Sequence, residues 1–255
     1  MGIVNITPDS FSDGGRLADA NAAIRQAERL IEEGADLIDL GAESTRPGAT
    51  PVPADVEVSR LMTVLVALRD APVPISVDTM KPDVMARALD AGASMINDVA
   101  AFTNAASREA VKGSDCALCA MHMQGTAQTM QVAPRYDDVV AEVTHHLRER
   151  TDALIADGVA RDRLLVDPGF GFGKTLEHNL ALLRRLGDIR SLGFPILVGL
   201  SRKGMIGMIT GRPLDERLAG SLAAALVAID NGARMVRVHD VAATVDAIGV
   251  WASTR

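Results

Sequence analysis

The feature that most constrains the fold is an alternation, repeated along the chain, between short apolar runs and longer segments with the hydrophobic period of a helix. Strands that alternate with helices build a parallel sheet, because each helix returns the chain to the starting edge for the next strand. Eight such units occupy 255 residues, and about 250 residues is the usual size of a closed (β/α)8 barrel. We therefore predict an α/β protein in which residues 1–255 form one TIM barrel. A doubly wound open sheet is the alternative.

The same pattern predicts where the elements lie. Glycines follow several helical stretches, and glycine ends helices well because it adopts positive φ angles at little cost. The first residue already belongs to a strand, so we expect the natural protein to begin further upstream. The predicted strands cover residues 2–6, 37–40, 75–77, 95–96, 117–121, 164–166, 196–198 and 235–238. The predicted helices cover residues 19–33, 54–69, 82–91, 105–112, 136–157, 176–187, 213–231 and 241–252.

Composition narrows the class of protein. Hydrophobic residues make up 48% of the chain, which is enough to build a core. The longest nearly apolar stretch, residues 219–229, has 11 residues, whereas a membrane span needs roughly 18. The first residues lack the basic and apolar regions of a secretory signal, so we expect a cytoplasmic protein that does not bind membranes. The net charge of −7 argues against nucleic acid as a partner.

Two cysteines, Cys116 and Cys119, form a C-x-x-C pair in a segment that reads as a buried strand. Residues three apart on a strand face opposite ways and lie roughly 10 Å apart, which is too far for a disulfide. No second pair of ligands completes a zinc site. We therefore interpret both thiols as structural.

Polar residues gather at the carboxyl ends of the predicted strands. In a parallel barrel these ends meet at one rim, where barrel enzymes carry their active sites. One such residue alone is usually a helix cap or loop anchor, but leaving several buried and unpaired costs roughly 1–3 kcal/mol each. Strand alternation puts Ser76 with Asp78, and Arg237 with His239, on the inner face. A rim with polar residues at every strand end therefore indicates an active site.

The chemistry of these rim residues suits a phosphorylated ligand with a flat, polar ring. Arg237 and His239 follow the last strand, where barrels frequently bind phosphate. Asn5 and Asp13 are hard oxygen ligands that suit Mg²⁺ in contact with phosphate. Carboxylates, an amide and an ammonium can bind a heterocycle that carries several N–H donors and a carbonyl. The residues that supply these groups are Asp78, Asn97, Asp167 and Lys203.

Some familiar sites are excluded. The glycine-rich segment 169–174 lacks the spacing of a phosphate-binding P-loop. The chain has no Gly-x-Ser-x-Gly elbow for a nucleophilic serine. The segments 7–15 and 41–48 are rich in Gly, Pro, Ser and Thr, and we interpret them as mobile lids.

A set of motifs, in order along the chain, resembles the motifs of the dihydropteroate synthase family. Each motif alone is modest, but the ordered set is highly specific and covers positions 1–240. The motifs are Met-Gly-Ile-Val-Asn-Ile-Thr-Pro-Asp-Ser-Phe-Ser-Asp-Gly-Gly (1–15), Glu-Ser-Thr-Arg-Pro-Gly (43–48), Ser-Val-Asp-Thr (76–79), Ile-Asn-Asp-Val (96–99), Asp-Pro-Gly-Phe-Gly-Phe-Gly-Lys (167–174), Ser-Arg-Lys (201–203) and Arg-Val-His-Asp (237–240).

The resemblance implies a condensation in folate biosynthesis. In this reaction 6-hydroxymethyl-7,8-dihydropterin pyrophosphate and 4-aminobenzoate form 7,8-dihydropteroate and pyrophosphate. It also implies the role of each rim residue, with Mg²⁺ as the cofactor. The pterin would be held by Asp78, Asn97, Asp167 and Lys203, and the metal by Asn5 and Asp13. The pyrophosphate would be bound by Asn5, Arg237 and His239, and catalysis would fall to Asp13, Lys203, Arg237 and His239. The aminobenzoate would be framed by Phe11, Thr45, Arg46, Pro47, Phe172 and Gly204.

The resemblance leaves some points open. It implies a homodimer through the late helices, although packing within the barrel explains the apolar residues 218–229 equally well. Many members of the family have serine where this chain has Gly204. The glycine either eases the turn into the next helix or leaves the aminobenzoate carboxylate to backbone N–H groups at that helix start. A methyltetrahydrofolate-type methyltransferase and a non-catalytic pterin-binding barrel are the competing interpretations.

Overall fold

The structure is a computed structural model that describes residues 1–6, 15–46 and 48–255; of residues 15–19 it describes the backbone. Short parallel strands form the centre of this described part, and each is built from one of the apolar runs. They are β1 (Gly2–Asn5), β2 (Ile38–Gly41), β3 (Ile75–Asp78), β4 (Met95–Asp98), β5 (Ala117–Met121), β6 (Leu164–Asp167), β7 (Leu197–Val198) and β8 (Met235–Val236).

The strands close into a ring. β1 to β6 pair in chain order, and β7 pairs with β8. Parallel bridges join the two sheets, because Gly2 pairs with Val238 and Val166 pairs with Ile196. The Val238 N–H also donates to the Met1 carbonyl at 3.0 Å. A parallel sheet that meets its own first strand is a barrel, so the predicted fold is confirmed.

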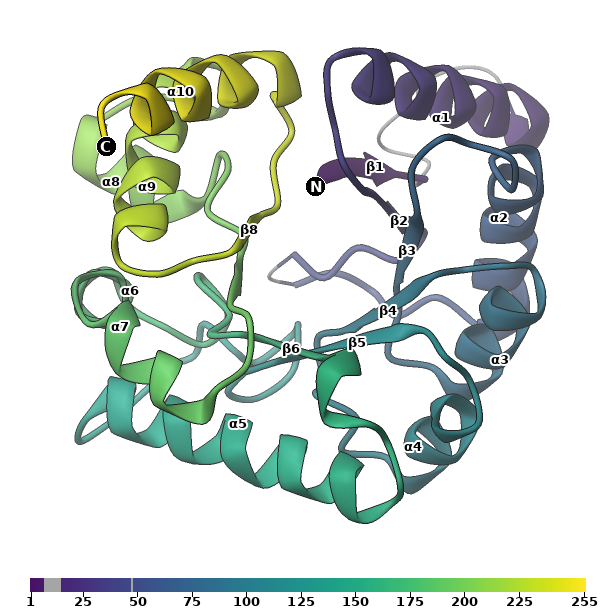
Figure 1. The fold of residues 1–255 in the computed structure, drawn as a ribbon, viewed down its shortest axis with the longest axis horizontal. Coiled ribbons are helices and arrows are strands. Elements are labelled where there is room, and N and C mark those ends of the chain that lie inside the picture. Colours follow the sequence, from purple (N-terminus) through teal and green to yellow (C-terminus); the bar gives the residue numbers. More distant parts are fainter. Residues whose placement is uncertain (7–14, 47) are drawn as a thin grey trace.

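Helices surround the barrel, as the view along its axis shows (Figure 1). They are α1 (Gly15–Glu32), α2 (Ala54–Ala67), α3 (Pro82–Asp90), α4 (Ala105–Lys112), α5 (Val139–Ala156), α6 (Leu176–Arg184), α7 (Leu186–Ile189), α8 (Gly204–Thr210), α9 (Leu218–Asp230) and α10 (Val241–Ser253). Short 3-10 turns are η2 (Arg161–Arg163), η3 (Arg190–Leu192) and η4 (Leu214–Glu216). None of the helices in the described ranges is long and apolar enough to cross a membrane.

The helices differ from the prediction in the second half of the chain. The helix predicted over 176–187 divides into α6 and α7 at Arg185, whose φ of −107° and ψ of 24° interrupt the helical path. The helix α8 lies outside the predicted ranges. It ends at Gly211, which adopts a left-handed φ of 70° and so stops the helix after two turns.

Alternation along the strands separates an outer apolar layer from an inner one. Val77 and Val238 lie in the outer layer, between the strands and the helices, as predicted. Ser76 points the other way and is also fully buried. The inner layer fills the amino-terminal half of the barrel with Met1, Leu37, Met95, Cys119 and Leu197. In the sheet register Met95 pairs with Ser76 and Cys119 with Asn97, so this apolar layer directly borders the inward-facing polar residues.

The two cysteines are free and buried, which confirms the interpretation that they form no disulfide. Cys116 belongs to the outer layer and Cys119 to the inner one. Burial raises the pKa of the Cys119 thiol well above its usual value, so this thiol is protonated and unreactive.

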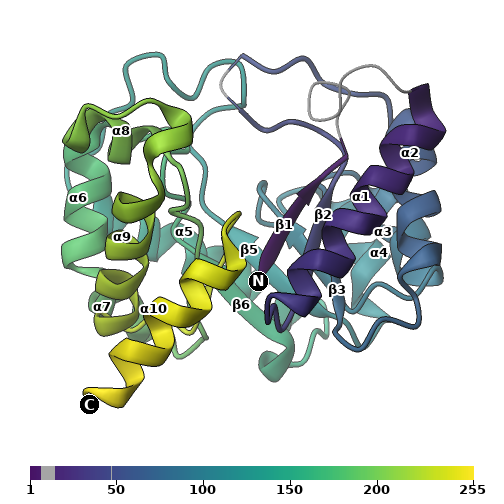
Figure 2. The same ribbon diagram turned by 90° about the horizontal axis from the view of Figure 1, so that it is seen from above.

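The carboxyl ends of the strands share one end of the barrel. Seen from the side, the loops after β2 and β5 lie together at that end (Figure 2). The Gly48 N–H donates to the Ala127 carbonyl at 3.0 Å and joins these two loops. This end is the rim on which the sequence places the site.

Candidate active site

Backbone register brings the predicted strand-end residues to one level of the barrel. Asn5 pairs with Gly41, Gly41 with Asp78, and Asp78 with Asn97. Asp167 ends β6 on the far side of the ring. Asp78 and Asp167 are the last residues of their strands, and Asn97 is the last but one of β4. The paired backbone fixes the positions of all three.

Arg237 crosses the mouth of the barrel and binds two carboxylates. Its Nε lies 2.5 Å from Asp39 Oδ2, and its second terminal nitrogen lies 3.0 Å from Asp78 Oδ2. The Asp39 side chain is fully buried, and that of Arg237 is 19% exposed. Asp39 was absent from the sequence prediction. The sequence could have identified Asp39 because this carboxylate lies inside the apolar run Leu37–Leu40, and a buried carboxylate requires a partner.

Several buried acceptors near this ion pair have no hydrogen-bond partner among the described residues. They are Asp39 Oδ1, Ser76 Oγ and Asn97 Oδ1. Asp39 pairs with Ser76 in the sheet register, so the atoms lie on adjacent strands. Buried polar atoms are almost always satisfied in folded proteins, and these face the barrel interior. The pattern suits a ligand with several N–H donors.

Burial raises the pKa of the acids in the mouth. The pKa of Asp78 rises to about 7, chiefly through burial, although Arg237 acts in the opposite direction. Burial likewise raises the pKa of Asp167 to about 6, opposed by the N–H of Gly169 and the charge of Lys203. Acids that are poised near neutrality can bind a donor-rich ring as carboxylates at physiological pH.

The turn after β6 is shaped around Asp167. Its Oδ1 accepts the Gly169 N–H at 2.7 Å. Gly169 has a φ of +69°, and a β-carbon there would lie 1.9 Å from the His122 carbonyl oxygen. Only glycine fits this close approach, so the first glycine of the segment 169–174 holds the carboxylate in place.

A buried lysine organises the rest of the same loop. Lys174 Nζ donates to the carbonyls of Gly169 and Phe172 at 3.0 Å each and lies 2.9 Å from His122 Nδ1. Burial and the Lys174 charge lower the pKa of His122 to about 2, so the neutral imidazole accepts this bond. Lys174 received no role in the sequence prediction. The only sign of its importance in the sequence is that a single cation follows three glycines.

Lys203 and Phe172 meet at the mouth from two different loops. Lys203 Nζ lies 4.1 Å from the centroid of the Phe172 ring, a cation–π distance. Burial and the charge of Arg237 lower the pKa of Lys203 to about 8. The carboxylates of Asp167 and Asp78 act in the opposite direction and raise this pKa. Lys203 therefore lies within electrostatic reach of both acids.

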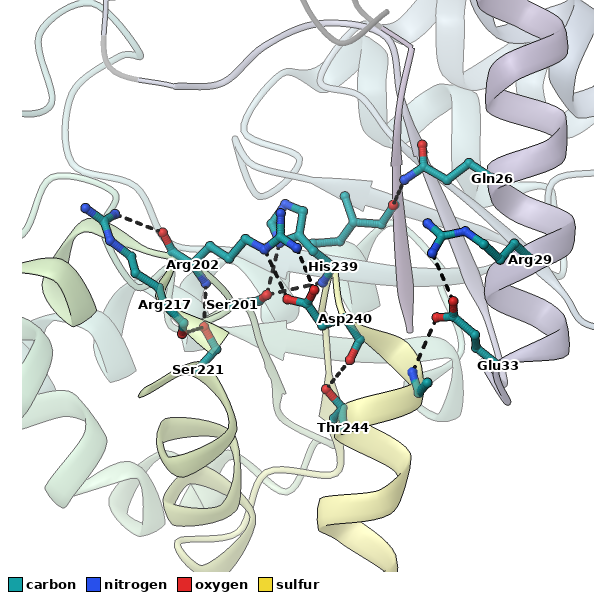
Figure 3. A network of polar contacts seen from close by, with 12 residues as sticks. Gln26, Arg29, Glu33, Ser201, Arg202, Arg217, Ser221, His239, Asp240 and Thr244 are labelled. Carbon is teal, nitrogen blue, oxygen red and sulfur yellow. Dashed lines mark hydrogen bonds and ion pairs between the residues drawn. The ribbon is translucent and has the colours of Figure 1, made fainter. Parts of the chain in front are cut away.

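His239 lies on the loop after β8 and is bound to the loop after β7 (Figure 3). Its Nδ1 is 3.0 Å from Ser201 Oγ, and its backbone N–H donates to the same oxygen at 3.2 Å. Burial, with the charges of Arg202 and Arg237, lowers the pKa of His239 to about 4. The imidazole is thus neutral at pH 7, so one of its ring nitrogens carries a hydrogen that it can donate.

The first residues of the loop after β2 are held by an ion pair with the loop after β3. Lys81 binds the carboxylates of Glu43 and Glu57, and Glu43 also accepts the Val52 N–H at 3.1 Å. The side chains of Thr45 and Arg46 form no hydrogen bond with any described residue, so the structure does not join them to the other site residues. Phe11, Asp13 and Pro47 lie outside the described residues.

Comparisons with known proteins agree with this geometry. A family model described as pterin binding enzyme matches residues 1–239. The dihydropteroate synthase of Neisseria meningitidis serogroup B is 49% identical over 258 residues, covering 98% of this chain and 90% of that protein.

Solved structures show the same fold. The Xanthomonas albilineans dihydropteroate synthase with 4-aminobenzoic acid has a TM-score of 0.94 and 52% identity, covering 100% of this chain and 92% of that one. The Burkholderia cenocepacia dihydropteroate synthase complexed with 7,8-dihydropteroate has a TM-score of 0.91 and 51% identity, covering 100% and 90%. This chain therefore belongs to the dihydropteroate synthase family of pterin-binding enzymes.

Proposed function

We propose that this chain condenses 6-hydroxymethyl-7,8-dihydropterin pyrophosphate with 4-aminobenzoate to give 7,8-dihydropteroate and pyrophosphate. The observation that carries the proposal is the barrel mouth, where buried acceptors of β2, β3, β4 and β6 face the cations Lys203 and Arg237. A ring with N–H donors matches the acceptors, and a pyrophosphate matches the cations.

The pterin is oriented by the strand ends. Asp167 and Asn97 are buried to more than nine-tenths, and their side-chain oxygens can accept the N–H groups of the aminopyrimidine ring. Lys203 can donate to the ring carbonyl. Because Asp167 and Asn97 lie on paired strands, the ring and its reacting carbon are held at a fixed place.

The leaving group departs toward the loops after β7 and β8. Arg237 and His239 stabilise its charge, and the carbon–oxygen bond breaks as the electron-rich pterin accepts positive charge on its exocyclic methylene. The arylamine of 4-aminobenzoate then attacks that carbon, the new carbon–nitrogen bond forms, and a proton leaves the nitrogen. An amine that attacks a cation needs no prior deprotonation, so we assign no general base.

The described residues are compatible with a Mg²⁺ ion that would take most of its ligands from the pyrophosphate. A β-carbon on Gly41 would lie 3.8 Å from Asn5 Oδ1 and 3.9 Å from Asp78 Oδ2, so both oxygens border the space that this glycine leaves. No group of three acidic, histidine or cysteine side chains in the described ranges could hold an ion alone. Mg²⁺ often takes few protein ligands beside substrate phosphates. Asn5 and Asp13 would hold it, and it would neutralise leaving-group charge.

Removal of the metal is expected to stop turnover without unfolding the barrel. Excess EDTA should abolish product formation because the pyrophosphate would keep its full charge as it leaves. The far-UV circular dichroism spectrum should stay unchanged, and added Mg²⁺ should restore the rate. Full activity in excess EDTA would contradict the assignment of Asn5 and Asp13.

Gly204→Ser is expected to strengthen aminobenzoate binding. Gly204 is the first residue of α8, its φ is not in the left-handed range, and a β-carbon there meets no atom within 4 Å. A serine is therefore accommodated without strain, and one added hydrogen bond to the carboxylate is worth about 0.5–1.5 kcal/mol. The KM for 4-aminobenzoate should fall by a factor of about 2 to 12. An unchanged KM in a folded variant would place the carboxylate elsewhere, at Thr45 and Arg46.

The decisive test of the function is the release of pyrophosphate from the pterin substrate, measured with and without 4-aminobenzoate. The proposal requires release that depends on the amine. A methyltransferase would release none, and a binding protein would bind the pterin without turnover.

We also propose that the chain forms a homodimer through its late helices. Large apolar side chains are exposed on the turns and helices of this region, and an exposed apolar patch marks an interaction surface. They are Met208, Ile209, Leu214, Leu218, Val227, Val245 and Val250. Sedimentation equilibrium should give twice the mass of the chain.

A further inference from the structure

The turn that carries Lys203 contains an arginine in an unfavourable backbone conformation. Arg202 has a φ of +58°, and the Lys203 N–H donates to the Leu200 carbonyl at 3.2 Å. The third position of such a turn favours glycine, because a side chain at positive φ crowds the backbone. A strained non-glycine residue beside an active site suggests that its side chain is needed.

The backbone N–H and carbonyl of Arg202 and two of its three guanidinium nitrogens form hydrogen bonds (Figure 3). Its N–H donates to Ser221 Oγ at 2.9 Å, and its carbonyl accepts from Arg217 at 3.2 Å. Its guanidinium donates two hydrogen bonds to the Asp240 carboxylate, from Nε at 3.0 Å and from a terminal nitrogen at 2.5 Å. Bidentate pairs of this kind define orientation as well as distance. The turn is therefore fastened both to α9 and to the loop after β8.

Two consecutive residues of one loop thus bind two consecutive residues of the next. Ser201 contacts His239, and Arg202 contacts Asp240. Lys203 follows directly after this pair of contacts, and it lies against Phe172. The group proposed for the pterin and the group proposed for the pyrophosphate consequently stand on loops whose relative position depends on Arg202.

We propose that Arg202 is a positioning residue, whose left-handed turn and bidentate pair with Asp240 set the placement of Lys203 relative to His239. The inference rests on the proposed function of those two residues. Arg202 itself touches neither substrate nor leaving group in this assignment. Its side chain lies beside the mouth and acts through its neighbours.

The glycine variant separates positioning from stability. Arg202→Gly removes the grip on Asp240, but glycine is the residue that the backbone at this position prefers. The variant should unfold at a temperature close to that of the parent. Its KM for the pterin pyrophosphate should rise by about 10- to 100-fold, the size of effect that a small misplacement produces. Its KM for 4-aminobenzoate should change far less.

Other variants complete the test. Asp240→Asn keeps the shape of the partner side chain but removes its charge. Arg202→Lys keeps the charge but cannot form two parallel hydrogen bonds with Asp240. Both variants should raise the KM for the pterin pyrophosphate more than the KM for 4-aminobenzoate, by a smaller factor than Arg202→Gly. Arg185→Ala is the control, because Arg185 also pairs with two carboxylates, Asp138 and Asp188, but on the surface of other helices. It should leave both KM values unchanged.

Binding of inorganic pyrophosphate, measured by calorimetry, gives a readout that does not depend on turnover. Arg202→Gly should weaken this binding relative to the parent. Unchanged pyrophosphate affinity and unchanged KM values in a folded Arg202→Gly variant would overturn the inference while leaving the reaction intact. If Arg202→Gly does not fold, Asp240→Asn decides, and parental KM values there would overturn it. An inactive parent protein that still binds pyrophosphate would contradict the proposed function alone.

Discussion

Arg237→Met is expected to destabilise the protein by about 3–5 kcal/mol, the cost of leaving a buried charge without its partner. Arg237 forms a salt bridge with the fully buried Asp39 and a second one with Asp78. Removing it leaves two desolvated carboxylates side by side. Urea denaturation followed by circular dichroism measures the loss, and calorimetry should show pyrophosphate binding reduced as well.

The destabilisation should depend on pH in a defined direction. The pKa of Asp78 is already raised to about 7 by burial, and it rises further without the arginine. When the pKa of a carboxyl is higher in the folded state than in the unfolded state, the free energy of unfolding decreases as pH increases through the folded-state pKa. The difference between the variant and its parent should therefore be larger at pH 8 than at pH 5.

A double variant separates the two roles of the arginine. In Arg237→Met with Asp39→Asn, one of the uncompensated charges is gone, so about 1–3 kcal/mol of stability should return. Pyrophosphate affinity should not return, because the cation is still missing. Recovery of both, or of neither, would contradict the view that Arg237 serves the fold through Asp39 and the substrate through its remaining charge.

Much of the fold was predictable because the strands are built from short apolar runs that alternate with helical segments. The runs at 75–77 and 164–166 extend by one residue in the structure, to Asp78 and Asp167. The helix α8 was not predicted because its sequence, Gly-Met-Ile-Gly-Met-Ile-Thr, has two glycines and an apolar surface without a helical polar face. Such a segment forms a helix through its surroundings rather than through propensity.

The site was predictable where strand order alone decides proximity. Asp78 and Asn97 were identified because parallel strands end at one rim, and the register confirms that they are neighbours. Asp39 was not, because its pairing with Arg237 joins residues 198 positions apart and depends on how the ring closes. The hydrogen bonds of Lys174 likewise depend on a loop path that no sequence periodicity reveals. Contacts of this kind follow from closure and loop geometry, which local sequence does not encode.

Asp167→Asn is expected to weaken pterin binding by about 2–4 kcal/mol, or about 30- to 850-fold, the value of a charge-assisted hydrogen-bonded pair. Asp167 Oδ1 is occupied by the Gly169 N–H. Asparagine can keep that bond through its oxygen, so its amide nitrogen would then face the ring as a donor against a donor. Calorimetric titration of the folded variant with pterin measures the loss.

Asp98→Asn is the matched control for this change, because burial raises the pKa of both acids to about 6. The carboxylate of Asp98 accepts the N–H groups of Ala100 and Phe102 at 2.7 Å each and so serves the backbone. Asp98→Asn should lower the unfolding temperature while the folded protein binds pterin normally. Parental affinity should also fall as pH decreases below about 6, since Asp167 then gains a proton, and this pH dependence should be reduced in Asp167→Asn. Equal pterin affinities in the two variants would mean that the ring is recognised by the carboxylates of Asp39 and Asp78 instead.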